Sequence, residues 1–398
     1  MLLVKLAVRN VLGAGLRTWL NVLALSFSFV VIVFLQGIYD GMNRQAMRAS
    51  VDALYGGGQY WHARYDPYDP LSLPDAHGPV PATLDALVAR GAATPILIRQ
   101  AAIYPSGRFR GIVLKGIAPG QTVLTIPSTV LRPRAGSGAA VAGGTIPGLI
   151  GARMAASTGL KPGDDVTVEW RDVHGTFDAA DVQIAQVMRT TVQEIDLDQI
   201  WIPLEDLRRL TDMPGQATLV VLRPGVVPPG TVSGWTWRDP AWLLRDLRAL
   251  IRSKSIGASV LYLVLLFLAM LAIFDTQVLA IFRRRREIGT LMALGMTRTQ
   301  VIGLFTAEGA LYGVLAALLA AGYGVPLLVW VAATGYGMPQ GTDRFGLAVG
   351  ERIFPVYPLA LVVGTVVLVL LVTTVVSFLP TRRIAKLKPT DALRGRMA

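Results

Sequence analysis

The 398-residue chain contains no cysteine, which excludes disulfide bonds, thiolate metal ligands and a catalytic thiol. Its three histidines, His62, His77 and His174, are scattered in polar contexts, so we expect no metal site. Charged residues make up only 16% of the chain, against about a quarter in soluble domains. Hydrophobic residues make up 53%, and the mean hydropathy is +0.50. This balance is typical of a membrane protein that also has room for a folded domain.

The chain also lacks the phosphate-binding motif G-x-x-x-x-G-K-[ST], whose backbone amides and lysine hold a nucleotide. We therefore expect that this chain binds no ATP itself and no other cofactor.

The net charge is +12, and the positions of the basic residues along the chain indicate which segments face the cytoplasm. Residues 1–17, 283–298 and 380–398 carry net charges of +3, +4 and +5, and the rest of the chain is balanced. Lysine and arginine gather in this way on the cytoplasmic side of membrane proteins. The pattern predicts that both termini are cytoplasmic, and it argues against a nucleic-acid-binding surface.

Four apolar segments are long enough to cross about 30 Å of hydrocarbon, which takes roughly 20 helical residues. They are residues 18–39, 255–282, 299–333 and 353–379. The first and the last carry no charge, whereas the second and third contain one acid each, Asp275 and Glu308. With cytoplasmic termini, residues 40–254 and 334–352 are predicted to face outward, and residues 380–398 form a cytoplasmic basic tail.

Residues 1–17 are predicted to form an amphipathic helix in the membrane surface, because Lys5, Arg9 and Arg17 recur at multiples of four. Residues 40–254 hold 22 Lys and Arg against 20 Asp and Glu, the balance of a water-soluble domain. The chain around Asp239-Pro240 has the form of a helix start, and we expect stalk helices at both ends of this domain. Such stalks can transmit motion, but ordinary helix ends with no mechanical role account for the same residues.

The outer domain is predicted to be of the α+β class. Runs rich in β-branched and aromatic residues predict strands at residues 96–104, 109–117, 166–170, 182–187, 199–204 and 218–222. Short helices are expected at residues 81–89, 147–158 and 204–211. No Ser/His/Asp arrangement and no helix-spaced carboxylate pair stands out, and Asp164, Asp165, Asp196 and Asp198 are interpreted as turn and surface residues. The chain is therefore predicted not to be an enzyme.

The most informative segment is the predicted cytoplasmic loop 283–298, with the sequence RRRREIGTLMALGMTR. It is too short to be a domain. Ile288, Leu291, Met292 and Leu294 would give a short helix an apolar face, while the arginines contact lipid phosphates. Exposed apolar residues in such a loop predict a docking surface for another protein. In the alternative interpretation, the loop only sets the topology and its apolar residues enter the lipid.

This loop, followed by a span with Glu308 near its start, resembles the FtsX/MacB-type permease superfamily. The ending Pro380-Thr-Arg-Arg, with Pro389-Thr-Asp-Ala-Leu-Arg further on, is similar to the tail of that family. Residues 148–168, GLIGARMAASTGLKPGDDVTV, and the later Ile200-Trp-Ile-Pro-Leu-Glu-Asp are similar to the periplasmic domain of lipoprotein-releasing permeases of the LolC/LolE type. The resemblance covers nearly the whole chain.

The resemblance implies a four-helix transmembrane permease, like the type VII ABC exporters, with a large α+β periplasmic domain between the first and second spans. The loop would supply the coupling helix that sits in a groove of an ATPase. The residues that would carry this contact are Arg286, Glu287, Ile288, Gly289, Leu291, Met292, Leu294 and Gly295. Two ATPase chains, which bind ATP and magnesium, would join a permease dimer whose subunits are either identical or related. The chain departs from MacB proper, in which an ATPase is fused at the front.

The function that the resemblance implies is mechanotransmission in the bacterial inner membrane. ATP hydrolysis by a separate ATPase would move the periplasmic domain, and so extract or export a lipoprotein or another amphiphile. Membrane lipids and a periplasmic or outer-membrane protein would be further partners. The alternative is an FtsX-like signalling subunit that regulates a periplasmic cell-wall hydrolase. The outer domain, about 215 residues long, fits the lipoprotein-releasing type better.

Asp275 and Glu308 lie about 12 and 15 Å from the cytoplasmic ends of their predicted spans, and so in the same leaflet. Intramembrane acids are costly, and they are default candidates for function. A proton relay is one interpretation. The nearby arginine cluster favours the other one, a structural or coupling role.

Overall fold

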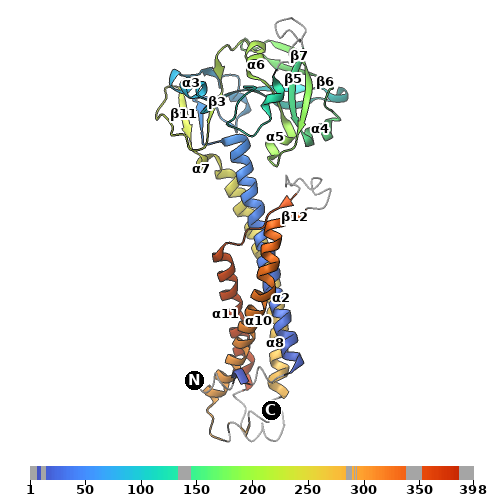
Figure 1. The fold of residues 1–398 in the computed structure, drawn as a ribbon, viewed down its shortest axis with the longest axis vertical. Coiled ribbons are helices and arrows are strands. Elements are labelled where there is room, and N and C mark those ends of the chain that lie inside the picture. The colour runs from blue at the N-terminus through green and yellow to red at the C-terminus, as the bar shows by residue number, and fades with distance from the viewer. Residues whose placement is uncertain are drawn as a thin grey trace. The chain divides into compact units, whose positions relative to one another are not determined.

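The computed structural model describes residues 7–9, 15–132, 145–283, 289–290, 292, 294–337 and 352–384. Two compact units are distinguished: the first comprises residues 1–43, 251–337 and 352–398, and the second residues 44–250 and 338–351. Figure 1 labels the elements of both units along the chain.

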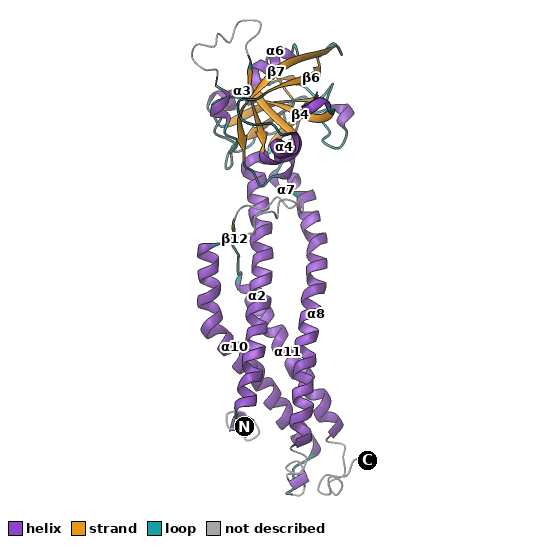
Figure 2. Ribbon diagram, turned by 90° about the vertical axis from the view of Figure 1, so that its right-hand side faces the viewer, coloured by secondary structure: helices purple, strands orange, loops and turns teal. Residues whose placement is uncertain are grey.

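The first unit is built from long helices, as Figure 2 shows in purple. They are α2 (Leu16–Ser50), α8 (Arg245–Arg283), α10 (Arg298–Thr334) and α11 (Leu359–Ile384), of which the first two continue into residues of the second unit. Among the described residues, three segments are long and apolar enough to cross a membrane: Trp19–Tyr55, Arg298–Thr334 and Leu359–Leu379. The second predicted span lies in α8, where many side chains are outside the described set, so the count of four spans stays a prediction.

The core of the first unit joins α2, α10 and α11. Its buried members include Val22 and Phe29 of α2, Ala316 and Ala320 of α10, and Val369 of α11. Large apolar side chains on the same helices, such as Trp330 of α10, point outward and stay exposed. A helix bundle with apolar residues both inside and outside is the arrangement that a lipid environment requires.

Glycines allow the helices of this unit to approach closely. A Cβ added at Gly324 of α10 would lie 2.6 Å from Cγ2 of Val30 in α2. One added at Gly313 would lie 2.7 Å from Oγ1 of Thr373 in α11. In lipid the hydrophobic effect does not hold helices together, so this close packing is a main source of their association.

The segment before α11 packs against α2 in an extended form. The backbone N–H of Val356 donates to the carbonyl oxygen of Gly37 at 3.0 Å. The apolar stretch that was predicted to span from Ile353 becomes helical only at Leu359. Pro358 precedes that helix, and a residue followed by proline is disfavoured in the helical conformation, which explains the later start.

The second unit is built on a nine-stranded sheet with the order β11-β1-β10-β3-β4-β8-β5-β7-β6. The strands are β1 (Gln59–His62), β3 (Ala93–Ile103), β4 (Arg110–Ile117), β5 (Ile146–Gly151), β6 (Asp165–Arg171), β7 (Phe177–Met188), β8 (Gln199–Pro203), β10 (Leu219–Leu222) and β11 (Trp235–Arg238). The helices are α3 (Ala82–Ala89), α4 (Ala152–Thr158), α5 (Gln193–Asp198), α6 (Leu204–Leu210) and α7 (Pro240–Leu243). Two-residue strands pair as β2 (Gly78–Pro79) with β9 (Gln216–Ala217), and β12 (Tyr336–Gly337) with β13 (Arg352–Ile353) in the first unit.

Part of this sheet closes into a barrel. The last strand, β6, also pairs antiparallel with β3, so β3, β4, β8, β5, β7 and β6 form a ring of six strands. Alternate side chains of all six strands gather in one buried cluster that includes Leu114, Val168, Ile184 and Ile200. Leu207 of α6 joins the same cluster. Closure removes the free edges of these strands, and the cluster fills the interior.

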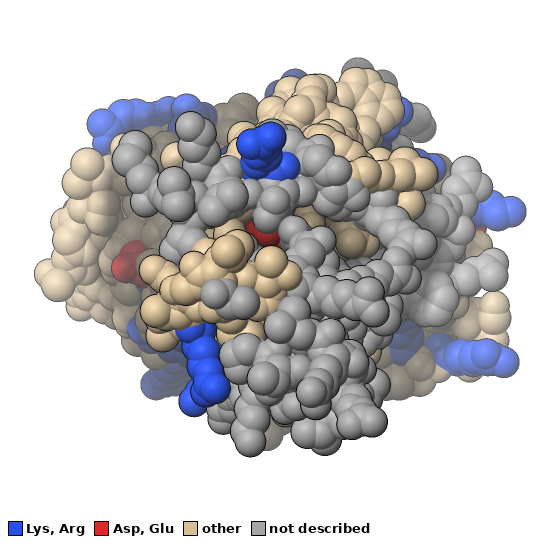
Figure 3. Space-filling view, turned by 90° about the horizontal axis from the view of Figure 1, so that it is seen from below, with Lys and Arg blue, Asp and Glu red and all other residues tan. Residues whose placement is uncertain are grey.

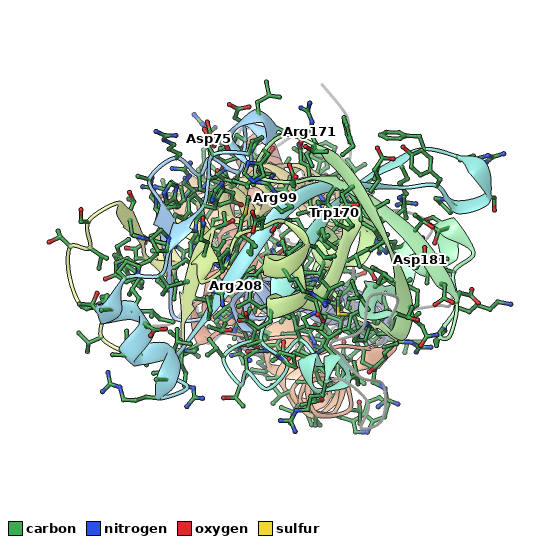
Figure 4. The ribbon with its side chains drawn as sticks, turned by 90° about the horizontal axis from the view of Figure 1, so that it is seen from above. Asp75, Arg99, Trp170, Arg171, Asp181 and Arg208 are labelled. Carbon is green, nitrogen blue, oxygen red and sulfur yellow. The ribbon has the colours of Figure 1, made fainter. Side chains whose placement is uncertain are left out.

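Arg99 holds the seam where β3 meets β6 (Figure 4). Its guanidinium is buried, the residue being 4% exposed, and it donates to four backbone carbonyls. Two belong to Leu73 and Pro74, at 3.3 Å, and two belong to Arg171 and Asp172, at 2.9 and 3.3 Å. Burial lowers the pKa of Arg99, while the carboxylate of Asp172 acts in the opposite direction. The guanidinium therefore fastens two chain segments across the seam through the oxygen atoms of their backbones.

The opposite face of the sheet carries a second core, which we call the outer-face core. It contains Ile98 and Trp201 from the sheet. Leu54, from the π turn Val51–Tyr55 that follows α2, and Leu243 of α7 pack into it as well. The chain segments that enter and leave the second unit thus end in one apolar cluster.

The six predicted strands are all present, each within a few residues of its expected ends, and helices α3 and α6 lie where helices were expected. The helix predicted at residues 147–158 is wrong in its first half, because Ile146–Gly151 forms β5 and only Ala152–Thr158 is helical. A short apolar run fits a buried strand as well as a helix. Here the run forms a strand because it pairs with β7 and β8.

We expect Gly324→Leu to destabilise the first unit and Gly322→Leu, two residues away on α10, to be tolerated. A side chain at Gly324 collides with Val30, whereas a Cβ at Gly322 meets nothing within 4 Å. Overpacking of this kind costs about 1–3 kcal/mol. Thermal unfolding of the two variants in detergent tests this, and equal melting temperatures would refute the assigned α2–α10 contact.

Candidate functional site

The predicted docking loop is compact where the structure describes it. The N–H of Leu294 donates to the carbonyl of Thr290 at 2.9 Å, as in a helical turn. Gly295 then turns the chain with φ +97°, a conformation that favours glycine. Thr297 caps α10 in a reciprocal capping box with Gln300. The segment therefore has a defined end, and α10 has a defined beginning.

Apolar contacts hold this segment on the first turns of α10. Met292 and Met296 pack against the buried Val301 and Phe305. Leu294 takes no part in that cluster and is 80% exposed. The result is a leucine presented to solvent from a segment that is anchored on both sides of it.

Other residues predicted for this contact are only partly described. Gly289 is helical and buried, and Gly295 is exposed. Arg286, Glu287, Ile288 and Leu291 lie outside the described residues. Their role in docking stays a prediction.

Of the two intramembrane acids, Glu308 lies in α10 and is 6% exposed. Asp275 lies in α8, and its side chain is outside the described set. Helix α11 carries small polar residues, Thr373, Ser377 and Thr381, that are fully or almost fully buried. Each hydroxyl donates to a backbone carbonyl three or four residues earlier, at 2.7–3.0 Å. These bonds allow small polar residues to lie between packed helices.

The basic segments are described too sparsely to test the predicted charge distribution. Seen from below, the described Lys and Arg side chains lie at several separate places (Figure 3). Most basic residues of the three predicted cytoplasmic segments fall outside the described side chains, so the orientation of the termini stays a prediction.

In the second unit, one acid was interpreted wrongly from the sequence. Asp196 is buried, at 4% exposure, and its carboxylate lies 3.2 Å from Nε of Arg153. It also accepts from the backbone N–H of Arg153 at 3.2 Å. Asp196 therefore ties α5 to the start of α4, whereas Asp164, Asp165 and Asp198 are exposed as expected. Among the described residues, no three His, Asp or Glu side chains are grouped as metal ligands.

Lys115 of β4 is the unexpected titratable group of the outer-face core. Its Nζ lies 5.0 Å from the centre of the Trp201 ring, between β3 and β8. Burial lowers its pKa to about 8, and the carboxylate of Glu194 opposes this shift. Burial also raises the pKa values of Tyr55 and Tyr65. This cluster could not be predicted from the sequence, because a lysine at an alternate position of a strand is expected to face solvent.

Comparison with known proteins agrees with the helical first unit. Residues 259–389 match the family described as FtsX-like permease C-terminal. Over 325 residues the chain is 24% identical to the lipoprotein-releasing system transmembrane protein LolC of Neisseria meningitidis serogroup B, which covers 76% of this chain and 78% of that protein. Over 134 residues it is 28% identical to an uncharacterized ABC transporter permease of Methanocaldococcus jannaschii, covering 33% and 30% of the two chains.

Among solved structures, the extracellular domain of the noncanonic ABC-type transporter YknZ from Gram-positive bacteria matches 48% of this chain and 94% of that chain. The TM-score is 0.25 and the sequence identity 13%.

The long apolar helices and the family match define a membrane protein of the ABC transporter permease class. Within that class, residues 259–389 match the FtsX-like permease family, and the chain is similar to LolC over 76% of its length.

We expect Lys115→Met to remove a pH dependence of stability. Between the folded pKa of about 8 and the unfolded value of about 10.4, the unfolded chain binds more protons, so stability rises with pH. The wild type should therefore gain stability from pH 8 to 9.5, and the variant should be more stable than wild type at pH 7, by at most about 3 kcal/mol. Tryptophan fluorescence during denaturation of the full chain measures both.

The exposed Lys161 provides the matched control, because Lys161→Met should keep the wild-type slope. Identical pH slopes in wild type and Lys115→Met would contradict the assigned burial of Lys115.

Proposed function

We propose that this chain is the permease subunit of an ABC transporter of the bacterial inner membrane, driven by a separate ATPase. ATP and magnesium are bound by two copies of that partner, and two permease subunits, identical or related, form the membrane part. Hydrolysis moves the outer unit and so extracts or exports a lipoprotein or a similar amphiphile.

The observation that carries this proposal is the anchored, exposed Leu294. A leucine that is 80% exposed on a segment fixed by Met292 and Met296 is suited to enter an apolar groove of another protein. These 398 residues contain no phosphate-binding motif, which supports a separate ATPase as the energy source.

Helix continuity supports the mechanical part. Helix α2 runs from Leu16 to Ser50, and α8 runs from Arg245 to Arg283. Neither is interrupted by a loop at the boundary between the two units. A displacement of these helices is therefore carried along a stiff backbone instead of being absorbed by a flexible linker.

The similarity to LolC supports a lipoprotein as the substrate, because LolC is named as part of a lipoprotein-releasing system. A second unit of this size also gives such a substrate a surface to contact. The alternative function is that of an FtsX-like signalling subunit, which regulates a cell-wall hydrolase. The proteins that are purified together with the chain distinguish the two functions.

Leu294→Asp should reduce recovery of the ATPase by at least about tenfold when the tagged chain is purified from native membranes. A carboxylate forced into an apolar contact costs about 1–3 kcal/mol or more. Leu294→Met keeps the apolar contact and serves as the control, and Gly289→Pro should uncouple ATP hydrolysis from substrate movement. Mass spectrometry of the purified wild type identifies the remaining partners.

Recovery of a lipoprotein with the ATPase supports transport, whereas a hydrolase or its activator supports signalling. Unchanged ATPase recovery and unchanged transport in Leu294→Asp and Gly289→Pro would remove the docking role of this segment.

A further inference from the structure

The start of α8 is fixed in place by a tryptophan. Asp239 follows β11 directly, and its carboxylate accepts from the backbone N–H of Trp242 at 2.6 Å. Pro240 occupies the first helical position, where its fixed φ favours a helix start. The side chain of Trp242 is therefore presented from a capped turn only three residues before α8 begins at Arg245.

Two guanidinium groups lie on the ring of Trp242. The central carbon of Arg238 lies 4.0 Å from the ring centre, and that of Arg245 lies 3.9 Å from it. Both distances are within the range of cation–π attraction. Asp246 accepts a hydrogen bond from the hydroxyl of Tyr68, and its carboxylate lies 3.5 Å from Nε of Arg245. The first turn of α8 is thus fixed to the end of β11 and to the chain after β1.

The same tryptophan contacts the sheet. Its ring meets that of Trp61 in β1 edge to face, with centroids 5.2 Å apart and planes at 84°. Trp61 donates from Nε1 to Oε1 of Gln59 at 2.6 Å. Gln59 in turn donates from Nε2 to the carbonyl of Leu54 at 2.7 Å. Leu54 belongs to the π turn that ends α2, so an unbroken series of contacts joins the start of α8 to the end of α2.

The glycines between α2 and β1 are packed as tightly. A Cβ at Gly57 would lie 2.5 Å from the carbonyl oxygen of Arg223, and one at Gly58 would overlap the ring of Trp237. The N–H of Gly57 donates to the carbonyl of Leu222 at 2.7 Å. This connection is therefore held against the neighbouring backbone, although three glycines in sequence suggest a flexible hinge.

The side chain of Arg238 lowers the stability of this arrangement. Nε of Arg238 is buried and has no hydrogen-bond partner within the described structure. An apolar side chain at this position would fill the space without an unsatisfied donor. Departures from local stability of this kind are typical of functional positions.

We propose that Trp242, Trp61 and Gln59 form a joint that locks the ends of α2 and α8 to each other and to the sheet. Through this joint, movement of either helix is delivered to the second unit as a whole. These three are positioning residues. The inference rests on the proposed function, since it says where the motion enters the outer unit.

The first test needs no ATPase. Trp242→Ala in the full chain should raise hydrogen exchange of the amides of Gly56 and Gly57 by at least tenfold, although these glycines lie far from residue 242 in sequence. Trp242→Phe keeps a ring in place and should restore most of the protection. Amides of β4 and β7 in the barrel should not change. Unchanged exchange at the two glycines in Trp242→Ala would overturn the joint.

The second test measures substrate moved per ATP hydrolysed in the reconstituted complex. Trp242→Ala and Gln59→Leu should lower this ratio at least tenfold, with ATPase recovery and ATPase rate within about twofold of wild type. Met154→Ala, in the barrel interior, serves as the control for destabilisation away from the joint. An equal loss of coupling in Met154→Ala at matched thermal stability would overturn the joint, because stability alone would explain it.

The two tests separate the two claims. If exchange at Gly56 and Gly57 responds as expected but no ATPase is recovered with the wild type, the proposed function fails while the connection between the helix ends stands. If the ATPase is recovered and coupling is unchanged in Trp242→Ala, the joint fails and the proposed function stands.

Discussion

A chain that crosses lipid has no water to bond to, so a span satisfies nearly all its backbone hydrogen bonds within one helix. This constraint makes α2, 35 residues long, and α10, 37 residues long, continuous rods. Helix α2 does not end with its apolar part but continues to Ser50, and its π turn is buried in the outer-face core. The proposed transmission of motion depends on this continuity, because a helix carries displacement only as far as its ends are held.

The predicted docking loop and the proposed joint are built on different physical principles. At the docking segment, methionines anchor a short turn on α10 and leave Leu294 exposed, which suits a contact that another chain completes. At the entry to the second unit, hydrogen bonds and ring contacts leave no freedom: Gln59 bonds both Trp61 and the backbone of Leu54. The first site is open to a partner, and the second is complete in itself. This difference agrees with the proposed role of a subunit that receives motion from an ATPase and passes it to the outer unit.

Those parts of the structure whose residue pattern fits only one kind of element could be predicted from the sequence. The long apolar helices and the six strands follow from hydrophobic runs and from β-branched composition, and the exposed Leu294 follows from an apolar residue in a basic loop. Barrel closure could not be predicted, because the pairing of β3 with β6 joins residues far apart in sequence. Asp196 looked like a surface residue, since its partner Arg153 comes from another helix. The joint was hidden for the same reason: Gln59 follows three glycines that suggest flexibility, and only the folded chain brings Trp242 to Trp61.

The central claim is that Leu294 contacts a separate ATPase, and the absence of cysteine makes a direct measurement feasible. Leu294→Cys can be cross-linked with a thiol-reactive reagent in native membranes, with Val325→Cys, exposed on the same unit, as the control. The account predicts an adduct between residue 294 and an ATPase chain, and none from residue 325. A cysteine at 294 that reacts only with reagents added outside the cell, or that yields no ATPase adduct although it is reactive from inside, would contradict the account.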